Sequence, residues 1–358
     1  MVRVVLAVLL LLSLAACDRA GSTAPFAESR TPPDLGPRFF APEAWAWGYL
    51  QVGEAPPQRY GVATTWRVPR AVVVISPGYG ETAETWFETA RGLTRQGYSV
   101  WVLDRAGQGG SGRLTLPRDL GYARSFEPDV KALTSLVRVV IRPRPGLPVI
   151  LLGHSDGAVV ALRAVEGGLA CDGVVLSSPS LEAAQTARAG IAALPGLDRI
   201  PGAGWRPWSR GVDDDRGLGL THDPWRGGIT KAWMTANPDL RLSLAGAAWT
   251  RAFGEASAQA VAEAPRVAPP VLMLTAGPAR ADAARLCAAM RACRIVAIPG
   301  ARPALHLEAD AWREAWWREV RDFIAAKVDA SRAVAPPEDD RDFQGGSEVF
   351  DDNRRPGD

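Results

Sequence analysis

The pentapeptide Gly-His-Ser-Asp-Gly at positions 153–157 constrains the fold more than any other stretch of this chain. An apolar run at 147–152 precedes it, and a second apolar run at 158–162 follows it. This pattern is typical of a buried strand, a tight turn and a helix, with glycines where side chains would collide with the backbone. The sequence therefore predicts that Ser155 is held in a strained conformation, with its hydroxyl exposed at the edge of a sheet.

Short apolar runs alternate with helical patterns along most of the chain, which is typical of a mostly parallel sheet flanked by helices. Strands are predicted at 45–52, 59–68, 72–76, 99–104, 147–152, 173–178, 271–275 and 294–298. Helices are predicted at 85–96, 127–141, 156–166, 282–291 and 307–327. The first two strands are expected to pair antiparallel. From about 180 to 265 the alternation gives way to Ala-, Trp-, Gly- and Pro-rich sequence, where we expect an inserted helical lid.

The N-terminal residues are not expected to be part of the fold. Residues 1–16 combine a positive charge with a short apolar stretch, which indicates a cleaved signal peptide and not a membrane span. Leu-Ala-Ala-Cys at 14–17 resembles the lipidation motif of bacterial lipoproteins, so we expect Cys17 to be lipidated. The alternative is a plain secretion signal with an incidental cysteine.

Four segments follow from this interpretation: a signal peptide at 1–16, a flexible tether at 17–38, a single domain at 39–330 and a disordered acidic tail at 331–358. The expected location is the bacterial cell envelope, anchored by lipid. Asp18, directly after the cysteine, favours the periplasmic face of the inner membrane.

Composition argues against nucleic-acid and metal partners, and it leaves open whether one disulfide forms. The formal net charge is +2, so no nucleic-acid partner is expected. The three histidines show no metal-ligand spacing, so we expect neither a metal nor another cofactor. In an oxidising compartment Cys287 and Cys293 could form a disulfide, which geometry decides and spacing does not.

Several spaced motifs carry a resemblance to a known family. Positions 77–81 read Pro-Gly-Tyr-Gly-Glu, positions 104–113 read Asp-Arg-Ala-Gly-Gln-Gly-Gly-Ser-Gly-Arg, and positions 177–179 read Ser-Ser-Pro. In the inserted region, Leu-Thr-His-Asp at 220–223 and Asn-Pro-Asp-Leu at 237–240 add to these. Together they resemble the monoglyceride-lipase and lysophospholipase branch of the α/β-hydrolases, which are serine aminopeptidase-like hydrolases. The resemblance covers about residues 45 to 328.

This resemblance implies an α/β-hydrolase fold and a role for Ser155 as the nucleophile that forms an acyl-enzyme. The backbone N–H groups of Tyr79 and Asp156 would form the oxyanion hole. The side chain of Asp156 could oppose the developing negative charge or point away along the helix N-terminus, and the sequence leaves both directions open.

The base and the acid of the family pattern are missing from their expected places. The position of the acid reads Ala279, and the position of the histidine reads Pro303, which can neither accept nor donate a proton. His306, one helical turn further on, is the candidate base, with Asp282 as the candidate acid. The alternatives are that Asp282 only caps a helix, that His306 has no catalytic duty, and that His222 serves as the base.

Two functions follow from these residues. The first is a serine hydrolase that cleaves a lysophospholipid or monoacylglycerol at the membrane through an acyl-enzyme on Ser155. The second is a catalytically lapsed hydrolase-like lipoprotein that binds a ligand or partner, as Ala279 and Pro303 favour. Amide substrates share this fold and chemistry. The sequence specifies neither acyl-chain length nor head group nor oligomeric state.

Overall fold

The computed structural model describes residues 26, 28–181, 197–199, 201, 205–210 and 219–334. The predicted signal peptide, Cys17 and most of the predicted tail lie outside these residues.

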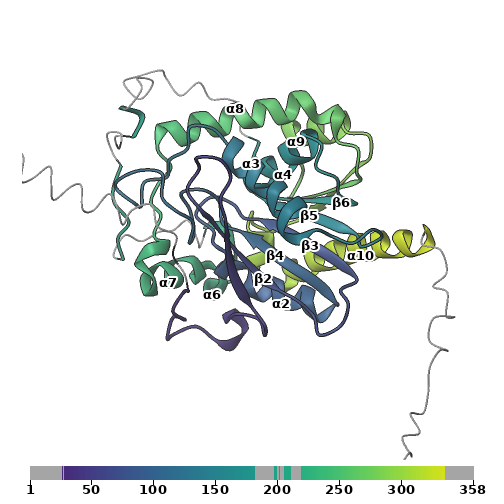
Figure 1. The fold of residues 1–358 in the computed structure, drawn as a ribbon, viewed down its shortest axis with the longest axis horizontal. Coiled ribbons are helices and arrows are strands. Elements are labelled where there is room, and N and C mark those ends of the chain that lie inside the picture. The colour runs from purple at the N-terminus through teal and green to yellow at the C-terminus, as the bar shows by residue number, and fades with distance from the viewer. Residues whose placement is uncertain are drawn as a thin grey trace, which may run out of the picture.

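One twisted sheet forms the centre of the fold (Figure 1). Its strands are β1 (Ala46–Leu50), β2 (Gln58–Ala63), β3 (Ala71–Ser76), β4 (Tyr98–Leu103), β5 (Val149–His154), β6 (Gly173–Ser177), β7 (Val271–Ala276) and β8 (Cys293–Ile298). Their order is β1-β2-β4-β3-β5-β6-β7-β8. The β1–β2 and β2–β4 pairs are antiparallel, and all other neighbours run parallel. The predicted mostly parallel sheet with its antiparallel opening pair is confirmed.

Helices cover both faces of the sheet (Figure 1). They are α2 (Phe87–Arg95), α3 (Glu127–Ser135), α4 (Gly157–Glu166), α8 (Ala247–Glu263), α9 (Ala281–Ala289) and α10 (Asp310–Val334). The core under α3, α4, α8 and α9 takes Val72 and Val74 from β3, whereas the core under α2 and α10 takes Val73 and Ile75. This alternation follows from the strand geometry, since successive side chains point to opposite faces.

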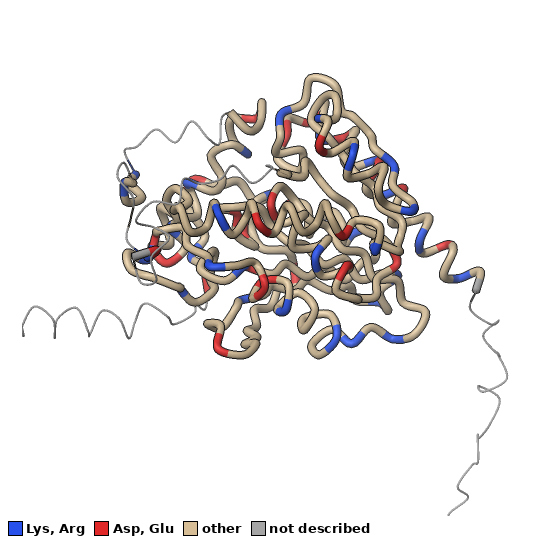
Figure 2. Tube along the Cα trace, turned by 90° about the horizontal axis from the view of Figure 1, so that it is seen from above, with Lys and Arg blue, Asp and Glu red and all other residues tan. Residues whose placement is uncertain are grey.

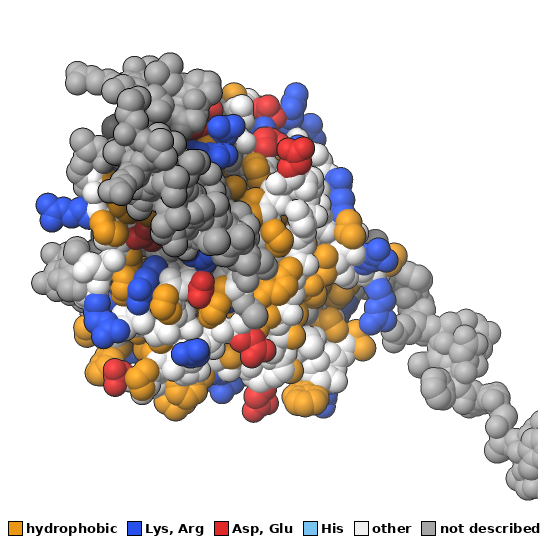
Figure 3. Space-filling view, turned by 60° about the vertical axis from the view of Figure 1, so that its left-hand side comes forward, with side chains coloured by type: hydrophobic (Ala, Val, Ile, Leu, Met, Phe, Trp, Pro, Cys, Tyr) orange, Lys and Arg blue, Asp and Glu red, His pale blue; other side chains and the backbone are white. Residues whose placement is uncertain are grey.

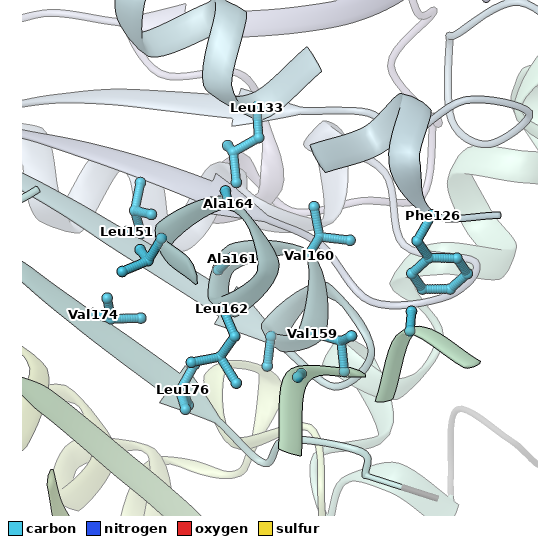
Figure 4. Packing of buried hydrophobic residues seen from close by; sticks show 14 of the residues in the cluster. Phe126, Leu133, Leu151, Val159, Val160, Ala161, Leu162, Ala164, Val174 and Leu176 are labelled. Atoms are coloured by element: carbon cyan, nitrogen blue, oxygen red, sulfur yellow. The ribbon is translucent and has the colours of Figure 1, made fainter. Parts of the chain in front are cut away.

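Helix α4 is buried almost throughout because it lies directly against the sheet. Figure 4 shows Val160 and Leu162 of α4 among side chains that come from α3 and from the strands, including Leu133, Leu151 and Leu176. This packing fixes the start of α4, and with it the turn that carries Ser155.

The segment between β6 and β7, in the part that the structure describes, holds short helices that lie apart from the sheet. They are η5 (Leu197–Arg199), α6 (Pro224–Gly227), α7 (Ile229–Ala236) and η6 (Pro238–Leu240), followed by α8 and η7 (Ala264–Arg266). Ile229, Trp233 and Met234 of α7 belong to a third apolar cluster, which we call the insertion cluster. Its other buried members are Leu35, Phe39, Phe87, Leu240, Leu242, Ala304 and Leu307.

The ends of the domain differ from the sequence prediction. Part of the segment that was predicted as a flexible tether packs on the domain: Leu35 is buried, like Phe39 at the start of the predicted domain, and the Arg30 amide donates to Asn237 Oδ1 (2.6 Å). The short helix η1 (Pro37–Phe39) lies in this segment. At the other end α10 continues to Val334, so the first residues of the predicted tail are helical. The apolar side chain of Leu35 explains the first difference, because its burial removes apolar surface from water.

Cys287 at the end of α9 and Cys293 at the start of β8 form a disulfide, with Cα atoms 5.3 Å apart. Cys171 is free and half-buried.

Charges of both signs are interspersed along the chain and over the surface. Blue and red residues alternate along the trace in Figure 2, and orange hydrophobic side chains are mixed with both charges on the face shown in Figure 3. Among the described residues no helix combines the length and the apolar character needed to cross a membrane.

Candidate active site

Ser155 lies in the predicted turn between β5 and α4, with a backbone φ of 52°. This left-handed conformation is strained for a serine, and the surrounding strand and helix hold it. A Cβ at Gly153 would lie 2.5 Å from Ala158 Cα, and a Cβ at Gly157 would lie 2.2 Å from Ser76 O. Both contacts are with backbone, so only glycine fits at either position.

A cavity of about 460 Å³ opens over Ser155. Its walls come from the loop after β3, the Ser155 turn, the segment between β6 and β7, and the turn after β8. Its apolar lining residues are Tyr79, Trp208, Leu220, Met234, Leu242, Leu244, Pro303, Ala304 and Leu307. Its polar and charged lining residues include Glu81, His154, Ser178, Arg206, Ser209, Thr221, Thr230, Lys231 and Ser243. The volume suits a small organic ligand with an apolar part and a polar part.

Pro303 lies on the wall of this cavity, together with Ser155. It is the position at which the family resemblance places the general base. The backbone around it is fixed, because the Ala304 amide donates to Leu220 O (2.9 Å) and joins the turn to the insertion. A residue at 303 therefore faces the nucleophile's cavity, but proline offers no proton acceptor there.

His306, the candidate base, is fully buried and does not line the cavity. Its ring stacks on Trp86, with centroids 3.8 Å apart and an interplanar angle of 3°. Burial, and next the proximity of His154, hold the pKa of His306 well below its ordinary value. The ring makes no hydrogen bond to any described residue, Ser155 included.

Asp282, the candidate acid, lies in the first turn of α9 and accepts a hydrogen bond from the Ala283 amide (2.8 Å). Arg280 lies 3.7 Å from its carboxylate. No hydrogen bond or ion pair joins Asp282 to His306 in the described part of the chain. The structure therefore does not bring together the three residues Ser155, His306 and Asp282 that the sequence suggested as a triad.

The other two histidines bind other partners through Nδ1. His222 Nδ1 lies 2.7 Å from Glu308 Oε1, and its ring stacks on Trp312. His154, directly before Ser155, bonds through Nδ1 to Ser177 O (2.9 Å). The chain contains three histidines, all of them described, and none is hydrogen-bonded to Ser155 Oγ.

Glu308 is a site residue that the sequence analysis did not single out. It is completely buried and accepts hydrogen bonds from the backbone N–H groups of His222, Arg302 and Ala309. Burial by itself would raise the pKa of Glu308, but these hydrogen bonds and the one to the imidazole lower it below its ordinary value. Glu308 thus ties the insertion to the turn after β8.

The predicted oxyanion-hole donor Tyr79 is already engaged. Its backbone N–H donates to Asp156 Oδ1 (2.7 Å), and the other carboxylate oxygen of Asp156 pairs with buried Arg105. The sequence left the direction of the Asp156 side chain open. In the structure this side chain points to the loop after β3, which carries Tyr79. An anionic oxygen at that N–H would have to displace a carboxylate.

A family model and solved structures match this chain over most of its length. A family model described as "Serine aminopeptidase, S33" matches residues 67–309, from the strand before the oxyanion-hole loop to the start of the last helix. The chain belongs to this family.

Proteins that are similar to this chain in sequence include enzymes named as lipid hydrolases. Lysophospholipase L2 of Escherichia coli is 34% identical over 109 residues, which are 30% of this chain and 32% of that protein. A monoacylglycerol lipase of Mycolicibacterium smegmatis is 34% identical over 126 residues, 35% of this chain and 43% of that protein. The matches thus span less than half the length of either relative.

Solved structures agree on the fold. The structure of a soluble variant of monoglyceride lipase from Saccharomyces cerevisiae superimposes with a TM-score of 0.63 at 17% identity, covering 83% of this chain and 99% of that one. The monoacylglycerol lipase of Paleococcus ferrophilus gives a TM-score of 0.57 at 23% identity, covering 75% and 98%. At these identities the likeness establishes the α/β-hydrolase fold.

Proposed function

We propose that this chain binds a monoacyl lipid, a monoacylglycerol or lysophospholipid, in the cavity over Ser155 without hydrolysing it efficiently. The observation that carries the proposal is Pro303 on the cavity wall, together with three histidines of which none is hydrogen-bonded to Ser155. A serine hydroxyl is a weak nucleophile unless an adjacent base removes its proton.

The state of the oxyanion hole supports the same conclusion. Asp156 occupies the N–H of Tyr79 that would otherwise receive the developing negative charge. Loss of one such donor costs about 10²- to 10³-fold in rate. A hydrolase that lacks its triad partners keeps only about 10³- to 10⁴-fold catalysis over water, which comes from the hole and from binding. In this chain one donor of the proposed oxyanion hole, the Tyr79 N–H, is also occupied.

The ligand class rests on the relatives and on the lining of the cavity. The matched relatives are named as lysophospholipases and monoacylglycerol lipases, whose substrates carry one acyl chain. Met234, Leu242 and Leu307 offer an apolar wall for such a chain, and Thr230 and Ser243 offer polar contacts. Lipidation of Cys17, an expectation from the sequence, would hold the cavity near a membrane of the cell envelope.

Binding and turnover can be separated by two measurements. A non-hydrolysable monoalkyl glycerol ether tests binding through tryptophan fluorescence, and a labelled fluorophosphonate tests activation of the serine. We expect Ser155→Ala to keep binding within about 3-fold, whereas Thr230→Trp, which fills the cavity, should weaken it at least about 10-fold. Val261→Trp, on the exposed surface of α8, is the matched control and should bind normally.

The labelling arm decides whether the protein is an enzyme. We expect fluorophosphonate labelling at least about 10³-fold slower than that of the M. smegmatis lipase, since both the base and a hole donor are missing. Rapid labelling that disappears in Ser155→Ala would disprove the lapsed-hydrolase proposal. Failure of the glycerol ether and of a lysophospholipid ether to bind would disprove the lipid ligand.

The second candidate is hydrolysis of the same lipid esters through an acyl-enzyme on Ser155. The strained φ of Ser155, kept within a complete turn and open to the cavity, favours it. It requires that His306, with Asp282 or another carboxylate, reach the hydroxyl from a position that the structure does not show. Rapid labelling that is lost in both Ser155→Ala and His306→Ala would establish it.

A further inference from the structure

Three side chains converge under the floor of the cavity, and the proposed function uses none of them as a group. Glu81 Oε1 lies 3.4 Å from His154 Nε2 and 3.5 Å from His306 Nε2. The three donor atoms all lie within 4.8 Å of one another. Both histidines are buried, whereas Glu81 is half-buried and lines the cavity.

The hydrogen bond of His154 fixes what its other nitrogen can do. Nδ1 faces the carbonyl oxygen of Ser177, an acceptor, so Nδ1 carries the proton. In the neutral ring Nε2 then has a lone pair and no proton. This lone pair faces a carboxylate oxygen at 3.4 Å, which is repulsive unless a positive species lies between them. That species is either a second proton on His154 or a cation.

The ring nitrogens of His306 also lack a hydrogen-bond partner among the residues that the structure describes. Its ring is fully buried, and neither of its nitrogens makes a hydrogen bond to the described residues. An unpartnered buried nitrogen is costly, because the group has lost its hydrogen bonds to water without replacement. The stack on Trp86 fixes the plane of the ring, and Nε2 lies on the side of Glu81.

Glu81 is held so that one oxygen remains for the two rings. Its Oε2 accepts hydrogen bonds from the Gly78 amide (2.8 Å) and from Trp86 Nε1 (3.2 Å). Protein ligands to metals are commonly oriented by such outer hydrogen bonds, on the carboxylate and on the far nitrogen of the imidazole. Glu81 and His154 both show this arrangement before any ion is considered.

We propose that Glu81, His154 and His306 form a three-ligand site for a zinc-like divalent cation. Zinc takes two histidines and one glutamate in known sites, with bonds of about 2.0–2.2 Å; a tetrahedron of such bonds has edges of ~3.4 Å. The two separations from Glu81, 3.4 and 3.5 Å, match those edges and exceed ordinary hydrogen bonds, and the ligand atoms of the two histidines lie within 4.8 Å of each other. The cavity provides the entry path, because Glu81 and His154 line it.

This site could not be predicted from the sequence, since its ligands come from three distant segments and have no common spacing. They are the loop after β3, the end of β5 and the short helix η8 (Leu305–Leu307). The proposal concerns an ion and stands apart from the lipid ligand, so the two can fail separately.

The test is a zinc titration of protein without an affinity tag, after dialysis against a chelator, with a chromophoric zinc indicator as competitor. We expect one zinc per chain, and visible absorption of four-coordinate Co²⁺ when cobalt replaces zinc. Glu81→Gln keeps the shape of the side chain, and His306→Phe keeps the stack on Trp86. Each should weaken zinc binding at least about 100-fold, because each removes a ligand.

His222→Phe is the matched control, because it removes a histidine outside the three-ligand site and should leave zinc binding unchanged. The proposal is overturned if wild-type protein binds no zinc, as expected of a doubly protonated His154 paired with Glu81. It is equally overturned if zinc binding survives in both ligand variants. Circular dichroism of Glu81→Gln and His306→Phe shows whether each variant has folded, and one folded variant is sufficient for the decision.

Discussion

Asp156 shows how one side chain can change the chemistry of an otherwise complete turn. Its carboxylate accepts the Tyr79 N–H and pairs with Arg105, so it neutralises a buried guanidinium and fills a donor position at once. A charge pair in this buried setting is not readily broken, because either partner alone would be left uncompensated. The loop that carries Tyr79, the predicted oxyanion-hole donor, is therefore stabilised with this N–H already bound to a carboxylate.

The position of Pro303 allows a gain-of-function test. Pro303→His places an imidazole on the cavity wall that Ser155 also lines. We expect fluorophosphonate labelling to rise by about 10²-fold, the lower end of general-base catalysis, because Asp156 still occupies the Tyr79 N–H.

Two variants control this experiment. Pro303→Asn has a side chain of similar size without a basic nitrogen and should not gain, and Pro303→His combined with Ser155→Ala should not be labelled. Equal labelling of the histidine and asparagine variants would show that position 303 is not within reach of the serine.

At the scale of residues, features that depend on neighbours in sequence could be predicted, whereas features that depend on a distant side chain could not. The strain at Ser155 follows from the two glycines beside it, so it could be predicted. The burial of His306 depends on Trp86, and the direction of Asp156 depends on Arg105. Neither partner is close in sequence, and a pattern of residues carries no information on which distant side chain will lie beside another.

At the scale of elements, the first turn of α3 organises the loop that carries Arg105. Asp129 is buried, and its Oδ1 accepts a hydrogen bond from the Ala106 amide (2.8 Å). Burial raises the pKa of Asp129 to about 6, although Arg105 opposes the shift. The folded protein thus holds this proton over a range in which the unfolded chain has lost it.

The sign of the pH effect follows. Between the unfolded pKa near 4 and the folded pKa near 6, Asp129 favours the folded state at the acid end and loses that contribution as pH rises. Asp129→Asn removes this titration and keeps an oxygen to accept from Ala106. Relative to wild type, its free energy of unfolding should increase between about pH 4 and pH 7, on the order of 3 kcal/mol.

Urea unfolding at several pH values measures this difference, and Asp322→Asn on the exposed side of α10 is the control that should follow wild type. Parallel pH curves for Asp129→Asn and wild type would contradict the prediction.

The helix that carries Asp129 was predicted from the sequence as a single run from 127 to 141. The structure instead changes to a wider π-helical turn at η3 (Leu136–Ile141), a difference that apolar spacing does not reveal.

At the scale of the whole molecule, the insertion cluster joins parts of the chain that are distant in sequence. Leu35 and Phe39 reach it from the N-terminal segment, Phe87 from α2, Trp233 from α7 and Leu307 from the turn after β8. The mostly parallel sheet could be predicted from alternating patterns. This cluster could not, because the N-terminal residues were interpreted from their Ser, Thr, Pro and Gly content as a tether.

Neighbouring phenylalanines test the importance of this contact. Phe39 is 2% exposed and Phe40 is 36% exposed. Phe39→Ala should lower the free energy of unfolding by about 3–5 kcal/mol, because it leaves a cavity in the cluster. Phe40→Ala should change it by less than about 0.5 kcal/mol. Similar midpoints in urea for the two variants would show that the N-terminal segment does not contribute to stability.

The walls around Ser155 are contributed by four stretches of chain that are distant in sequence. A ligand that binds between them binds only the folded state, so it raises the free energy of unfolding. The melting temperature of the protein can therefore serve as the assay for an unknown ligand, with no need for a reaction to follow.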